Sequence, residues 1–107
     1  MNFALEKAIA NEAFEAARIA EAEFRAKFGE PFYCGFAWVN VRPGTSKMAK
    51  YLKTKDHAHK SYEGGVDVWN PGGSNTQSMD IKEVGASAFA KVLRDHGYKA
   101  YAKSRAD

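Results

Sequence analysis

Two short segments rich in hydroxyl, amide and basic side chains could bind an anion. They are 42–47 (RPGTSK) and 70–78 (NPGGSNTQS), and each follows an apolar run and precedes a helix-like pattern. Free backbone amides and the positive end of a helix attract phosphate or carboxylate at such junctions, and glycine lets a ligand approach the backbone. The candidate ligand-binding residues are Arg42, Thr45, Ser46, Lys47, Trp69, Asn70, Ser74, Asn75, Thr76 and Arg105.

These residue types suit a nucleotide or another phosphate-bearing small molecule. Arginine offers a planar fork to phosphate and lysine a point charge, so Arg42 and Lys47 together fit several anionic oxygens. Trp69 could offer an aromatic face to a base, and the alternative for Trp69 is a place in the core. Turns and helix caps require the same residue types as the two junctions, so purely structural roles are the alternative there.

Other chemistries find little support in the sequence. It contains no serine-nucleophile elbow, no dinucleotide-binding glycine loop and no phosphate-binding glycine-lysine-serine loop. Cys34 lies in an aromatic run, where a small core residue is expected. His57 and His59 could hold a transition metal, but neighbouring lysines and the lack of a closed ligand set favour solvated histidines. We predict no catalytic residue, metal or cofactor, and the question of an enzyme stays open, leaning against one.

The composition is that of one globular domain. The chain has 107 residues, 45% of them hydrophobic and 27% charged, and its single cysteine excludes a disulfide framework. We expect a cytoplasmic protein, because no apolar run fits a signal peptide or a membrane span. Within the net charge of +3, segment 42–60 holds six basic residues and one acidic residue. This segment could attract nucleic acid, or it could be the solvated lysine face of a helix.

The pattern of apolar residues and chain breakers predicts a single α/β domain over 1–107. A long amphipathic helix over 2–28 should be followed by a strand at 32–41 covered on both faces, and by a helix from 45 or 46 to 54. After a loop at 55–65, the pattern predicts a strand at 66–69, a helix capped by Asp80 and ended by Gly97, and a strand at 98–102. The expected fold is therefore a small three-stranded sheet with the long first helix and two further helices packed on it.

The direction of the strands decides whether the candidate residues meet. Right-handed crossovers would make the strands parallel and bring both junctions, with Arg105, to one edge of the sheet. The short second strand could instead run antiparallel, because the loop before it is long enough for the chain to reverse.

The first helix also predicts an oligomer. About 26 helical residues extend about 39 Å, whereas a domain of this size has a radius of gyration of about 13 Å. The overhanging apolar face would carry Phe3, Ile9, Phe14 and Phe24. We therefore expect a homodimer that covers this face.

Several segments resemble small uncharacterised proteins encoded by tailed bacteriophages. They are CGFAWVNV at 34–41, GGVDVWNP at 64–71, NTQSMD at 75–80, AFAKVL at 88–93 and SRAD at 104–107. The resemblance implies expression in a bacterial host cytoplasm and a role in sequestering a signal or modulating a host factor, and it implies no activity. A binding module for an anionic small ligand is thus the first hypothesis. The alternatives are a protein- or nucleic-acid-interaction protein that inhibits a host factor, and then a small hydrolase or transferase.

Overall fold

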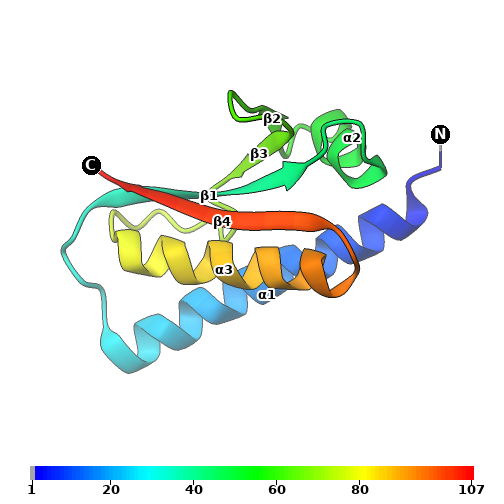
Figure 1. Cartoon of the computed structure of the whole chain (residues 1–107). Helices are drawn as coiled ribbons and strands as arrows, with labels where there is room; N and C mark the ends of the chain where they lie inside the picture. Colours follow the sequence, from blue (N-terminus) through cyan, green and yellow to red (C-terminus); the bar gives the residue numbers. More distant parts are fainter. Residues whose placement is uncertain (1) are drawn as a thin grey trace.

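The computed structural model describes residues 2–107 as one mixed α/β unit (Figure 1). In chain order the elements are α1 (Ala4–Phe28), β1 (Gly35–Arg42), α2 (Lys47–Thr54), β2 (His59–Lys60), β3 (Val66–Trp69), α3 (Met79–Asp95) and β4 (Lys99–Ala106). From β1 to β4 this is a strand-helix-strand-strand-helix-strand order, the split βαβ arrangement. No helix within residues 2–107 is long and apolar enough to cross a membrane.

The four strands form one antiparallel sheet in the order β2-β3-β1-β4. The mixed α/β class is confirmed, whereas the predicted three-stranded sheet is wrong by one strand. β2 contains only two exposed polar residues, so it has no apolar alternation that could distinguish it from a loop. β4 extends four residues beyond the predicted end at Ala102, and Arg105 therefore lies within the strand.

One face of the sheet packs on the two long helices. Figure 1 shows α1 and α3 on the same side of β1 and β4. The β1 and β3 residues on this side are small or β-branched and buried, and we call it the covered face. Its buried members are Gly35, Ala37, Val39, Val41, Val66, Val68 and Ala100.

Helix α1 packs on α3 through small side chains. Ala10, Ala13 and Ala17 are buried, and they allow the backbone of α1 to come close to Ala86 and Ala90 of α3. α1 ends where predicted, because Gly29 adopts a φ of 74° that favours glycine.

Three of the four residues that suggested a dimer are packed within the chain itself. Ile9 is buried, the Phe3 ring lies 5.6 Å from that of Tyr51, and the Phe14 ring lies 4.9 Å from that of Phe89. The assignment of these three to a bare face is therefore wrong. Phe24 is half-buried, with its ring 4.8 Å from that of the exposed Phe28. The homodimer itself stays a prediction.

Two serines cap the shorter helices. Ser46 accepts a hydrogen bond from the amide of Ala49 at the start of α2, as predicted. Ser78 accepts one from the amide of Ile81 at the start of α3. The expected cap at Asp80 is wrong, because this residue already lies in the first helical turn. Its charge there still suits the positive end of the helix.

Candidate functional site

The two strand-to-helix junctions lie at opposite ends of the sheet. β1 and β3 are antiparallel, with Trp38 opposite Trp69 and Val41 opposite Val66. The segment after Trp69 therefore begins beside Ala37, and Arg42 lies five residues further along β1, about 17 Å away at 3.3 Å per residue. The ten candidate residues do not form one site, and the predicted common edge is wrong.

The first junction serves the local structure. Besides the cap by Ser46, the Nζ of Lys47 lies 3.8 Å from the buried carboxylate of Glu6 on α1. The guanidinium of Arg42 donates to the side chain of Asn40, and Thr45 is exposed. These contacts favour the structural alternative for this segment.

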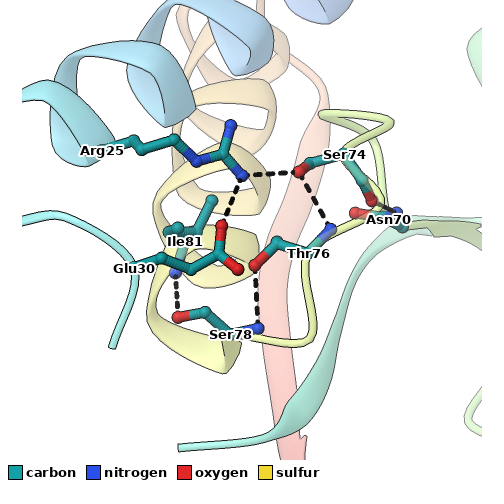
Figure 2. A network of polar contacts seen from close by, with 7 residues as sticks. All are labelled: Arg25, Glu30, Asn70, Ser74, Thr76, Ser78 and Ile81. Atoms are coloured by element: carbon teal, nitrogen blue, oxygen red, sulfur yellow. Dashed lines mark hydrogen bonds and ion pairs between the residues drawn. The ribbon is translucent and has the colours of Figure 1, made fainter. Parts of the chain in front are cut away.

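The second junction is a chain of hydroxyl-to-amide hydrogen bonds (Figure 2). Ser74 Oγ accepts from the amide of Thr76, Thr76 Oγ1 from the amide of Ser78, and Ser78 Oγ from the amide of Ile81. The amides of Thr76 and Ser78 in the loop, and that of Ile81 in α3, are thereby occupied. An anion could not displace these contacts without opening the entry to α3, so they favour the structural alternative for this segment too.

This loop is also tied to the end of α1. Arg25 donates to Ser74 Oγ at 3.0 Å and forms an ion pair with Glu30 at 3.2 Å (Figure 2). Asn70 donates to the carbonyl of Ser74, while Asn75 is exposed. The loop is thus held on both sides, and it fixes the end of β3 that carries Trp69.

Two of the ten candidates meet elsewhere, on the sheet face opposite the covered one. This face, which we call the open face, carries every second residue of the strands. Its residues are Phe36, Trp38, Asn40 and Arg42 of β1, His59 of β2, Asp67 and Trp69 of β3, and Lys99, Tyr101, Lys103 and Arg105 of β4. Trp69 is 48% exposed, so its alternative place in the core is wrong, as is the expected covering of β1 on both faces.

Three aromatic rings of the open face form a continuous platform. The rings of Trp38 and Trp69 are stacked, with centroids 5.4 Å apart and an interplanar angle of 15°. The ring of Phe36 lies 5.6 Å from that of Trp69. We call Phe36, Trp38 and Trp69 the aromatic platform, in which Trp69 is exposed and the other two rings are half-buried.

A hollow of about 410 Å³ lies beside the platform. Trp38, Trp69 and Asp67 line it from the sheet, Arg105 lines it from β4, and the 61–63 segment lines it from the β2–β3 connection. This connection is held over the open face because Asn40 donates to the carbonyl of Gly64 and Lys103 bonds Glu63. The β2–β3 connection thus lies over the Arg42 end of the open face, whereas the Trp69 end is accessible to solvent.

The charged side chains around the hollow differ in whether they form ion pairs. Lys103 Nζ lies 2.5 Å from Glu63 Oε1, and this hydrogen bond holds the pKa of Glu63 below its ordinary value. Arg105 places its guanidinium 5.7 Å from the ring centre of Phe36, and it forms no ion pair with any of residues 2–107. The hollow therefore borders one cation that is free to bind an anionic group.

A buried lysine and a buried glutamate lie on the helix side of the platform. Lys82 of α3 is 8% exposed, donates to the carbonyl of Gly35 at 3.0 Å, and places Nζ 5.2 Å from the ring centre of Phe36. Glu21 of α1 is buried nearby, and burial raises its pKa although Arg25 and Lys82 attract its charged form. Phe36 is therefore held against a fixed cation.

Sequence reasoning missed Phe36, Trp38 and Asp67 as site residues. Apolar rings at alternate positions of β1 were assigned to a second buried face, and one short strand gives no sign that this face is open. Cys34 was likewise predicted to be a core residue, yet it is exposed, and its thiol donates to the carbonyl of Phe32. The detectable signal was the pairing of large rings on one side of β1 with alanine and valine on the other.

Neither the comparisons with known proteins nor the placement of metal-ligating side chains assigns a function to the site. No family model matches the chain, and no curated protein and no solved structure matches it either. Among residues 2–107 there is no group of three or more histidine, cysteine or acidic side chains that could hold a metal ion.

Proposed function

We propose that the protein binds single-stranded nucleic acid on the open face, with bases stacked on the aromatic platform. The observation that carries the proposal is the cluster of Phe36, Trp38 and the exposed Trp69 beside the guanidinium of Arg105, which forms no ion pair with the described residues. Four-stranded sheets that bind RNA use aromatic side chains of their open face in the same manner. Each stacked base contributes about 1–3 kcal/mol to such binding.

The charge distribution favours a nucleic acid over an apolar protein partner. Arg105 can contact a phosphate while the neighbouring base lies on the platform, and the net charge of +3 attracts a polyanion. This retains the predicted anionic ligand but moves its site from the two junctions to the open face. It also retains two of the predicted residues, Trp69 and Arg105. A role in modulating a phage host remains a proposal that this site neither requires nor excludes.

The test is the binding of a short, fluorescently labelled single strand, measured by anisotropy. We expect Trp69→Leu to weaken binding about 5- to 150-fold, which corresponds to the loss of one stacked base. Arg105→Ala should weaken it about 10-fold or more, as expected for a hydrogen bond to a charged group. Lys7→Ala removes the same charge from an exposed position on α1 and should have little effect.

Competitors separate the proposal from its alternatives. A duplex should compete poorly, because its bases are not free to stack, and a mononucleotide should compete weakly because it offers one base and one phosphate group. Weak binding that Lys7→Ala and Arg105→Ala reduce equally would indicate nonspecific attraction of charge and would overturn the proposal. Failure of the wild-type protein to bind any single strand would favour a protein interface on this face.

A further inference from the structure

We infer that the hollow beside the aromatic platform selects guanine, and that Asp67 is the residue that determines this specificity. The inference rests on the proposed function and names the base that its site prefers. Its starting observation is that Asp67 lines the hollow between the platform and the 61–63 segment. No cation among residues 2–107 forms an ion pair with Asp67, so its carboxylate can accept hydrogen bonds from a ligand.

Asn40, which lies opposite Asp67 on β1, fixes the position of this carboxylate. Asn40 is fully buried, and its amide donates to Asp67 Oδ1 at 2.9 Å and to the carbonyl of Gly64 at the same distance. The carbonyl oxygen of the Asn40 side chain is occupied by Arg42. Asn40 can therefore not turn over without losing these contacts, and Asp67 is held in one orientation. A carboxylate oriented in this way can discriminate between ligands by geometry as well as by charge.

The platform places a base beside this carboxylate. Asp67 and Trp69 are two residues apart on β3, so their Cα atoms lie about 7 Å apart on the same face. A base that stacks on Trp69 and enters the hollow can thus turn its hydrogen-bonding edge toward Asp67. Arg105, on the other side of β1, remains available for the phosphate.

Guanine is the base whose edge fits an acceptor-only group. Its N1–H and N2–H donors lie side by side and can bond one carboxylate. Adenine and cytosine present one amino group next to a ring-nitrogen acceptor, and thymine or uracil presents one N–H between two carbonyls. In these three bases an acceptor would face the carboxylate and be repelled. The other carboxylate at the hollow, that of Glu63, is already engaged by Lys103.

The experiment compares labelled oligothymidylate with the same strand carrying one central guanosine. We expect the guanosine strand to bind the wild-type protein about 5- to 150-fold more tightly, the range for a bidentate base contact. Inosine lacks the N2 amino group and should lose a large part of this preference. Adenosine and cytidine at the same position should bind no better than thymidine.

Two matched variants assign the preference to one carboxylate. Asp67→Asn keeps the shape of the side chain and an oxygen for Asn40, and it should reduce the guanosine preference to less than about 3-fold while thymidylate binding persists. Glu23→Gln removes the same charge from an exposed position on α1 and should leave the preference unchanged. Equal binding of both strands by the wild type, or a preference that survives in Asp67→Asn, would overturn the inference and leave the proposed function standing. Failure of every strand to bind would overturn both.

Discussion

The covered and open faces of the sheet are built from the same strands but from different side chains. On the covered face of β1, Ala37, Val39 and Val41 are at most 1% exposed, because α1 and α3 leave room only for small or β-branched residues. On the open face, Phe36 and Trp38 alternate with them and remain partly accessible. Strand formation alone does not require these rings, and large exposed apolar groups usually mark a site of interaction. The side chains of the covered face are thus explained by packing in the core, whereas the rings of the open face are explained by the binding that we propose.

The largest expected effect tests this separation through stability. Phe89 is fully buried beneath the covered face and contacts Phe14, so Phe89→Ala should lower the free energy of unfolding by about 3–5 kcal/mol. Trp69→Ala removes a larger side chain from the open face, yet it should cost only about 0.5–1.5 kcal/mol, the value of an aromatic pair. Chemical denaturation followed by circular dichroism measures both. Equal losses would show that the platform is part of the core.

Parts of this architecture could be predicted from the sequence because they depend on local signals. The uninterrupted alanine-rich run and Gly29 define α1, and Ser46 is a capping residue before α2. β3 was predicted because Val66 to Trp69 is an apolar run between clusters of chain breakers. These features require only neighbours in the chain.

The rest depends on contacts between distant segments. The antiparallel register that puts Trp38 beside Trp69 joins residues 31 positions apart, and no local pattern specifies it. The same register moves Arg42 away from Asn75, and the pairing of β4 with β1 brings Arg105 to the hollow that Trp69 lines. Two of the residues chosen by side-chain type, Trp69 and Arg105, thus line the hollow. The grouping of both junctions at one edge was wrong, because it relied on parallel strands.

A smaller effect should appear beneath the covered face, where the packing is not purely apolar. The carboxylate of Glu21 occupies space left by Gly72 and Gly85, and its Oε2 is buried without a hydrogen-bond partner in the part of the chain that the structure describes. Because burial raises its pKa, the folded protein holds the Glu21 proton more tightly than the unfolded chain does. This contribution to stability is fully present below the ordinary pKa of glutamate and is lost as the pH rises through the raised value.

Glu21→Gln, which resembles the protonated form, should therefore be more stable than the wild-type protein at neutral pH. The difference should shrink as the pH falls and Glu21 becomes protonated, and denaturant midpoints across this range measure it. Glu23→Gln, at an exposed position of the same helix, is the control and should give no such trend. A loss of stability in Glu21→Gln at neutral pH would show that attraction to Lys82 and Arg25 outweighs the cost of burial.

The smallest expected effect concerns the part of the open face that we exclude from the site. Tyr101 is 47% exposed and pairs across the sheet with Asn40, in the half of this face where the β2–β3 connection is tied down. Tyr101→Ala should change the free energy of unfolding by no more than about 0.5 kcal/mol, as is usual for surface substitutions. It should leave the anisotropy titration with single-stranded nucleic acid unchanged, because Tyr101 belongs to neither the aromatic platform nor the hollow. If Tyr101→Ala weakened binding as much as Trp69→Leu, the ligand would have to cross the whole open face and displace that connection. The platform would then be only one part of a longer binding surface. The division of the open face into a half beneath the β2–β3 connection and an accessible half would be wrong.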